Sequence, residues 1–320
     1  MTARYIGKGD KAFAVLNMLE ADVCIMTTPG LDVLQIKRSR GVRHYAHIVH
    51  AAGSGILYRL FGLDHYDSFF SPGPQQEGPI RKLEKLRGIK PKQILHSGCP
   101  YFDVFMEQKR NLGKEQHGER EDGIRILVAP TWGSSGLLSR YGQSLLKPLA
   151  EAGYQVVVRP HPQSRMVESE LLESLEHELS AWPNLVWDKS SNGFEAMSSA
   201  DILISDYSSI IFDFAYVMER PVLTMDFTPD LSPYDAYDLG ETPWALQAHK
   251  RLGRKLTLDD IPNIAEIVEE LHNDKELKEQ ILIERDNNVY NFGKAGPVIA
   301  DQLIAIRNSL KEKNKGNNHA

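Results

Sequence analysis

The chain has 320 residues, of which 42% are hydrophobic and 25% are charged, and its formal net charge is -6 at pH 7. These values are typical of a globular protein with room for two domains, and the acidic balance argues against a dedicated nucleic-acid binder. Its two cysteines, Cys24 and Cys99, are too few and too far apart for a disulfide framework or a zinc ribbon, which indicates a reduced, cytoplasmic protein. No apolar run reaches the roughly 18 residues that a membrane span requires.

The first half of the chain shows an incomplete alternation of strands and helices. Short β-prone segments lie at residues 22–27, 42–49, 66–70 and 93–96. We interpret residues 1–108 as an N-terminal α/β domain, and we expect it to be incomplete because it is short and no strand precedes Tyr5. The charged, glycine-containing stretch 109–123 predicts an interdomain linker.

The second half has a clear α/β rhythm. Apolar runs separated by helix-length segments lie at residues 124–129, 154–159, 184–187, 201–205 and 221–225. Continuous apolar strands of this kind are typical of a parallel sheet buried on both faces. Two or three amphipathic helices follow between residues 259 and 310. We therefore predict a second α/β domain over 124–310 and a disordered tail over 311–320.

Hydroxyl side chains follow the strand predicted at 201–205. Asp206, Ser208 and Ser209 precede a helix predicted at about 210–218. Free N–H groups and the positive end of the helix dipole make such a start suited to a phosphate or diphosphate. The alternative is that these residues only cap the helix, since Ser and Asp are favoured capping residues.

Two further strand ends carry polar side chains. Arg159 and His161 follow the strand at 154–159, and their spacing puts both side chains on one face of an extended segment, where they suit phosphate binding and proton donation. Thr131 and Ser134 follow the strand at 124–129 in a glycine-rich loop. Because ligands of parallel α/β folds collect at the carboxyl ends of the strands, we expect these groups to share one site. The alternative is an exposed surface loop.

Three histidines lie in the strand predicted at 42–49 or directly after it. On a strand His47 points away from His44 and His50, and those two lie about 20 Å apart, so the three cannot share a metal ion. A helix would bring successive members onto one face. His50, at the strand end, is placed for catalysis, whereas His44 and His47 suit structural roles. The basic stretch 81–92 predicts a solvated helix face, with contact to an anionic membrane surface as the alternative.

At these motifs the chain resembles the CDP-glycerol glycerophosphotransferase family, which builds teichoic-acid and capsule backbones. The resemblance rests on VAPTW (128–132), VRPHP (158–162), SDYSSIIFDFA (205–215) and RPV (220–222), in that order. It implies a GT-B fold, in which two Rossmann-like α/β domains face a cleft, and a reaction that needs no metal ion. Two positions depart from the family pattern. Ala51 stands where a Trp-His-Gly-type loop has glycine, and Gly133 stands where the family has arginine.

The resemblance also implies roles for single residues. The nucleotide would lie on the second domain, with Arg159, His161, Ser208 and Ser209 on the diphosphate and Asp213 orienting the ribose or its own helix. His50 matches a first-domain histidine that resembles the acceptor base of the family.

The expected activity is transfer of glycerol-phosphate, or a related polyol-phosphate, from a CDP-activated donor to a hydroxyl of a glycan or lipid-linked acceptor. We expect no cofactor, no nucleic-acid partner, and a cytoplasmic protein that contacts the inner face of the cell membrane. Two alternatives stay open: a nucleotide-sugar transferase or epimerase of the same fold, and a non-catalytic nucleotide-binding protein.

Overall fold

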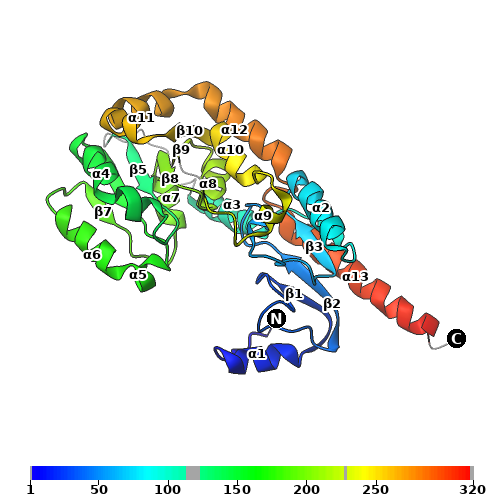
Figure 1. Cartoon of the computed structure of the whole chain (residues 1–320). Helices are drawn as coiled ribbons and strands as arrows, with labels where there is room; N and C mark the ends of the chain where they lie inside the picture. The colour runs from blue at the N-terminus through cyan, green and yellow to red at the C-terminus, as the bar shows by residue number, and fades with distance from the viewer. Residues whose placement is uncertain (1, 113–122, 227–228, 318–320) are drawn as a thin grey trace. The chain divides into compact units, whose positions relative to one another are not determined.

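The computed structural model describes residues 2–112, 123–226 and 229–317, without the side chains of 313–317. The chain forms two compact units (Figure 1). Unit 1 consists of Met1–Asp103, Asp230–Pro243 and Asn288–Ala320, and unit 2 consists of Val104–Pro229 and Trp244–Asn287.

Unit 1 is built on a four-stranded parallel sheet with the order β1-β2-β3-β4. The strands are β1 (Glu20–Met26), β2 (Gly41–Ile48), β3 (Ser68–Ser71) and β4 (Gln93–His96), so all four strands expected in the first half are confirmed. The helices and turns of this unit are α1 (Asp10–Asn17), η1 (Gly55–Leu57), η2 (Pro74–Gln76), α2 (Glu77–Arg87), α9 (Asp235–Leu239) and α13 (Ala295–Asn317). Helix α3 (Pro100–Leu112) begins in unit 1 and continues in unit 2.

The carboxyl-terminal helix α13 completes the core of unit 1. Its Ala295, Ile299 and Ile306 form a buried cluster with Ala46 of β2 and Phe70 of β3. The carboxylate of Asp103 accepts hydrogen bonds from the Ala295 and Gly296 N–H groups (2.9 and 2.6 Å), which satisfies two of the first donors of α13. Residues about 190 positions apart in the sequence therefore stabilise one another.

Unit 2 is built on a six-stranded parallel sheet with the order β10-β9-β8-β5-β6-β7. Because β5 is the first strand of the unit, this is the Rossmann order 3-2-1-4-5-6, and the order reverses between β5 and β8. The strands are β5 (Arg125–Val128), β6 (Gln155–Val158), β7 (Leu185–Trp187), β8 (Ile202–Ser205), β9 (Val222–Met225) and β10 (Gly253–Leu256). The five predicted strands of this half are confirmed, whereas β10 was not predicted.

Helices cover both faces of the second sheet. They are α4 (Leu137–Glu151), α5 (Ser164–Val167), α6 (Ser169–Glu178), α7 (Phe194–Ser199), α8 (Ile210–Asp213), the π-helical turn η3 (Phe214–Met218), α10 (Trp244–Leu252), η4 (Leu258–Asn263), α11 (Ile264–Asn273) and α12 (Lys275–Asn288). The consecutive residues Ile126, Leu127 and Val128 are all fully buried, as are Ile202, Leu203 and Ile204. Burial of successive side chains requires cover on both faces, which explains the unbroken apolar runs.

The units differ from the predicted domains. The predicted boundary at residue 108 is wrong because α3 passes from one unit to the other, and the predicted second domain is wrong because 230–243 and α13 belong to unit 1. Of the predicted linker 109–123, residues 109–112 are the end of α3 and 113–122 lie outside the described residues. Of the tail predicted as disordered over 311–320, residues 311–317 continue α13 and 318–320 lie outside the described residues.

Candidate functional site

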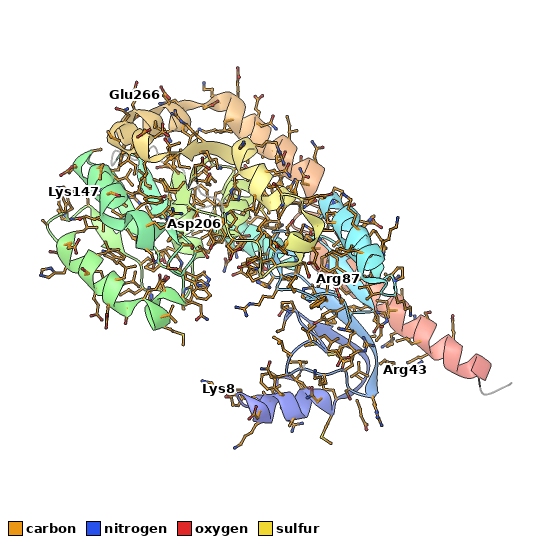
Figure 2. All side chains as sticks on the ribbon, in the orientation of Figure 1. Lys8, Arg43, Arg87, Lys147, Asp206 and Glu266 are labelled. Carbon is orange, nitrogen blue, oxygen red and sulfur yellow. The ribbon has the colours of Figure 1, made fainter. Side chains whose placement is uncertain are left out.

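The loops after β5 and β8 meet where the strand order reverses, and Asp206 joins them (Figure 2). Its carboxylate accepts hydrogen bonds from the N–H groups of Thr131 (2.9 Å) and Leu137 (3.1 Å) in the β5 loop, and of Tyr207 (2.8 Å) and Ser208 (3.2 Å) in its own loop. Asp206 is only 2% exposed. Burial raises the pKa of Asp206, and the four N–H groups oppose that shift by stabilising the carboxylate.

Asp206 is therefore a structural clamp between two loops. Both carboxylate oxygens already accept hydrogen bonds within the protein, and the predicted contact of Asp206 with the nucleotide stays a prediction. The sequence could not show the clamp, since two of the donors lie about 70 residues away along the chain.

Ser208 and Ser209 lie directly before helix α8 and the π-helical turn that continues it. Ser209 occupies the capping position, and its hydroxyl makes no capping hydrogen bond to this helix, so the capping alternative does not hold for Ser209. The N–H groups of Ile211 and Phe212 donate to the carbonyls of Ser208 and Ser209 (3.3 and 3.1 Å). Ser209 is exposed and Ser208 is half-buried, and their contacts with a diphosphate stay predictions.

Asp213 lies at the end of α8 and has different surroundings from Asp206. It is 7% exposed, and its Oδ1 has no hydrogen-bond partner within the protein. Burial raises the pKa of Asp213 to about 7. A buried carboxyl group with a free oxygen is costly unless a donor reaches it, which fits the predicted role toward ribose hydroxyl groups.

Arg159, at the end of β6, is turned toward the loop after β7. Its Nη1 forms an ion pair with Asp188 and donates to the carbonyl and hydroxyl oxygens of Ser190 (3.2 and 3.1 Å). Burial raises the pKa of Asp188, but hydrogen bonds from Ser190 and Arg159 outweigh this and lower it overall. Arg159 is therefore a partly neutralised cation.

His161 lies on the side of β6 that faces β5, opposite to the partners of Arg159. The Gln163 N–H group donates to His161 Nδ1 (3.1 Å), so the neutral imidazole carries its proton on Nε2. Its ring centroid is 6.5 Å from that of Trp132 in the β5 loop. Burial lowers the pKa of His161, and the nearby Glu168 carboxylate acts against that shift. The prediction that Arg159 and His161 converge on one face is wrong, because each contacts a different neighbouring loop.

The glycine-rich loop after β5 carries Thr131 and Ser134. The Thr131 side chain is half-buried and Ser134 is exposed at the tip of the loop. Gly133 has a φ of 95°, a left-handed conformation that the arginine of the family pattern would rarely adopt. The predicted nucleotide contacts of Thr131 and Ser134 stay predictions.

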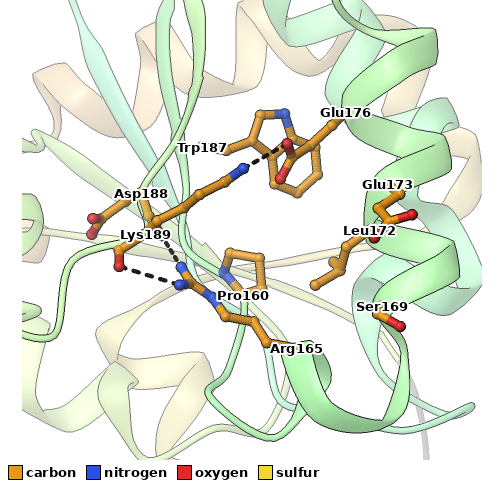
Figure 3. Close-up of a pocket in the computed structure, with 9 residues that line it drawn as sticks. All are labelled: Pro160, Arg165, Ser169, Leu172, Glu173, Glu176, Trp187, Asp188 and Lys189. Atoms are coloured by element: carbon orange, nitrogen blue, oxygen red, sulfur yellow. Dashed lines mark hydrogen bonds and ion pairs between the residues drawn. The ribbon is translucent and has the colours of Figure 1, made fainter.

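A cavity of about 230 Å³ flanks this site at the ends of β6 and β7 (Figure 3). Its lining includes Pro160, between the two candidate residues, and Trp187 and Asp188. Arg165 donates to the carbonyls of Asp188 (2.6 Å) and Lys189 (3.2 Å), and Lys189 pairs with Glu176 (2.8 Å). The cations around the cavity thus hold the protein together at the flank of the site.

The segment with His44, His47 and His50 contains strand β2, as predicted. His50 is exposed after β2, at the carboxyl end of the strand. His44 contacts the Ser68 hydroxyl (3.0 Å), and the buried His47 contacts the Tyr58 hydroxyl (3.1 Å), which fits their expected structural roles. The catalytic role of His50 stays a prediction.

The loop that follows His50 is held by a buried residue that the sequence did not single out. The Gln76 side chain accepts a hydrogen bond from the Gly55 N–H (2.8 Å) and donates to the Gly53 carbonyl (3.0 Å). Gln76 is 2% exposed. These contacts define the loop after His50.

Part of the basic stretch 81–92 is ion-paired within unit 1. Arg87 pairs with Asp64 and Asp235 (2.8 and 2.7 Å). Further ion pairs join Arg81 to Glu84, Lys92 to Glu84 and Lys82 to Glu241. Lys82, Lys85 and Lys90 are exposed, so part of the stretch is the predicted solvated face, and the alternative of contact with an anionic membrane stays a prediction.

Two further searches of the described residues give negative results. No three His, Cys, Asp or Glu side chains in them are grouped so that they could hold a metal ion. No helix in the same residues is long and apolar enough to cross a membrane.

Comparison with known proteins identifies the family. The family model for CDP-Glycerol:Poly(glycerophosphate) glycerophosphotransferase matches residues 52–240, more than half of the chain. The chain belongs to this family. The matched range contains the loops after β5, β6 and β8, so the resemblance drawn from the sequence motifs is confirmed.

Curated relatives of this glycerophosphotransferase family match part of the chain. It is 30% identical over 158 residues to a teichoic acid poly(glycerol phosphate) polymerase of Bacillus spizizenii, covering 45% of this chain and 37% of the relative. It is 29% identical over 175 residues to a teichoic acid glycerol-phosphate primase of Bacillus subtilis, covering 53% of this chain and 41% of the relative. The matches thus span less than half the length of these relatives.

Solved structures confirm the fold class. The chain is similar to the wall teichoic acid polymerase TagF soaked with CDPG, with a TM-score of 0.56 and 18% identity over 95% of this chain and 74% of that chain. It is also similar to a UDP-GlcNAc 2-epimerase of Methanocaldococcus jannaschii, with a TM-score of 0.52 and 12% identity over 89% of this chain and 77% of that chain. The fold is GT-B, as predicted.

Proposed function

We propose that the protein transfers glycerol-phosphate, or a related polyol-phosphate, from a CDP-activated donor to a hydroxyl of a glycan or lipid-linked acceptor in cell-surface polymer synthesis. The observation that carries this proposal is the pair Ser208 and Ser209 before a helix at the crossover of the unit 2 sheet, where the Ser209 hydroxyl makes no capping hydrogen bond. Hydroxyl groups and a helix start at this point of a Rossmann sheet suit a diphosphate. The family assignment supports a CDP-activated donor.

Donor binding uses several elements of unit 2. The hydroxyls of Ser208 and Ser209 donate to the diphosphate, and the unpartnered Asp213 carboxyl accepts from the ribose. Arg159 adds positive charge at the next strand end, reduced by its pair with Asp188. No metal ion is part of this arrangement.

The reaction displaces CMP from the donor. His50 removes the proton of the acceptor hydroxyl, whose oxygen then attacks the phosphorus that carries the polyol. The bond between this phosphorus and the bridging oxygen breaks, and CMP leaves with the electron pair. His161 carries its Nε2 proton toward the departing phosphate and stabilises the charge that develops there.

A lipid-linked acceptor would bring the protein to the inner face of the cell membrane, which is why we propose a cytoplasmic, peripheral protein.

The test is release of CMP from CDP-glycerol in the presence of EDTA and candidate glycan and lipid-linked acceptors. We expect acceptor-dependent CMP release that His50→Ala lowers about 10²–10⁴-fold while CDP binding persists. Turnover of UDP-GlcNAc instead would support the epimerase alternative. Binding of CDP without CMP release for any acceptor would support the non-catalytic alternative.

A further inference from the structure

Glu168, which none of the sequence motifs contains, connects the loops that carry His161 and Gly133. Its Oε2 accepts a hydrogen bond from the Gly133 N–H (3.0 Å), and its Oε1 accepts one from the Ser139 hydroxyl (2.7 Å). The Glu168 N–H group also donates to the carbonyl of the buried Ser164 (2.7 Å). One side chain thus joins the β5 loop, helix α4 and the loop after β6.

The Glu168 carboxylate is an unusual neighbour for a site that we propose to bind a diphosphate. An unpaired negative charge there would repel the ligand. Its hydrogen bonds lower the pKa of Glu168 overall, although burial raises it, so the group is a carboxylate saturated by donors. The charge of Glu168 also raises the pKa of His161, against the larger effect of burial.

The β5 loop is held at two places by carboxylates. Asp206 holds its ends through Thr131 and Leu137, and Glu168 holds its middle through Gly133. Gly133 stands where the family pattern has arginine, and its left-handed backbone turns its N–H group toward Glu168. The middle of the loop is therefore fixed to the segment that carries His161.

We propose that Glu168 is a positioning residue of the donor site. Its side chain is long enough to hold the β5 loop against the loop that carries His161. This rests on the proposed function, because it assigns both loops to one donor. Glu168 contacts no donor itself in this proposal.

Two single substitutions separate the effect of side-chain length from the effect of charge. Glu168→Gln keeps the length and one oxygen for the Gly133 N–H, while its amide donates to Ser139, whose hydroxyl has a second acceptor in the Gly133 carbonyl (3.0 Å). Glu168→Asp keeps the charge and shortens the side chain by one methylene group. Positioning therefore predicts that Gln preserves function and Asp does not. A role of the charge predicts the reverse.

The first experiment measures CDP affinity by calorimetry and kcat by CMP release in these variants, with Glu170→Ala as the control at an exposed position of α6, the helix that Glu168 precedes. We expect Glu168→Gln and Glu170→Ala to stay within about threefold of the unchanged protein, and Glu168→Asp to lose at least tenfold in CDP affinity or kcat. Unchanged values for Glu168→Asp, or an equal loss in Glu168→Gln, would overturn the proposal.

A second experiment needs no CDP and separates this inference from the proposed function. We expect hydrogen exchange of the Gly133 amide to accelerate at least tenfold in Glu168→Asp and to stay near its original rate in Glu168→Gln. If Glu168→Asp accelerates the exchange and Glu168→Gln does not, but the unchanged protein binds no CDP, the proposed function fails and the link between the loops stands. If Glu168→Asp leaves the exchange unchanged, the inference fails whatever CDP does.

Discussion

Two buried carboxylates near the start of α8 have opposite hydrogen-bonding environments. Asp206 accepts hydrogen bonds from four backbone N–H groups, whereas Asp213 has an oxygen with no partner in the protein. The first environment stabilises a negative charge and builds the site, and the second leaves a group that a ligand can satisfy. Residue type alone does not separate these two roles.

The Asp213 carboxyl predicts a pH-dependent loss of stability. Its folded pKa is raised to about 7, whereas an unfolded Asp titrates near 3.9, so the folded state holds the proton more tightly. The stability of the unchanged protein relative to Asp213→Asn therefore falls as pH rises from about 4 to 7, by on the order of 2–4 kcal/mol. Urea unfolding at pH 4.5 and pH 8 measures this, and a difference that does not change with pH would contradict it.

Removal of the Asp206 clamp leaves several buried N–H groups without an acceptor. We expect Asp206→Ala to lower the free energy of unfolding by about 2–4 kcal/mol and to weaken CDP binding through the displaced loops. The matched control is Asp230→Ala, whose carboxylate accepts hydrogen bonds from Ser232 at an exposed position and whose loss should cost less than about 1 kcal/mol. Equal effects of the two substitutions in urea unfolding would disprove the clamp.

At the scale of elements, helix α2 shows how a basic sequence serves packing. Arg87 is 8% exposed in its side chain and lies between the carboxylates of Asp64 and Asp235, the latter from the distant helix α9. Its guanidinium also lies 4.6 Å from the ring centroid of Phe61. The helix is thereby fixed to the segment 230–243 of the same unit.

Breaking this cluster should unfold unit 1 more readily. Arg87→Ala leaves two buried carboxylates unpaired, so we expect a loss of about 3–5 kcal/mol in the free energy of unfolding. Lys85→Ala, on the exposed side of the same helix, should change it by less than about 0.5 kcal/mol. Thermal or urea unfolding checks both, and a neutral Arg87→Ala would contradict the packing role.

Local pattern predicted most elements, and non-local contacts decided the rest. Apolar runs predicted five strands of unit 2, because burial on both faces leaves a direct mark on the sequence, and short β-prone segments predicted the four strands of unit 1. The tenth, β10, is a polar segment, GRKL, at the edge of its sheet and carries no such mark. The motifs pointed to the loops after β5, β6 and β8, but the partners of Asp206, Arg159 and Glu168 come from other loops and were not predictable from the motifs.

At the scale of the whole molecule, the chain order does not follow the units. The chain leaves unit 2 after Pro229, returns to unit 1 for 230–243, and does so again after Asn287. Contacts such as Arg87 with Asp235 and Asp103 with Ala295 fix these returning segments. A polar stretch in the sequence was therefore a poor guide to the boundary, since long-range contacts define a unit.

The central claim is that CDP binds in unit 2 at the start of α8 without a metal ion. The direct measurement is calorimetric titration of CDP in EDTA into the unchanged protein and into the double variant Ser208→Ala, Ser209→Ala. We predict binding to the unchanged protein and a loss of about 1–3 kcal/mol in the variant, because hydrogen bonds to a charged group are removed. Equal CDP affinity of the two proteins, or binding that requires a divalent ion, would contradict the claim.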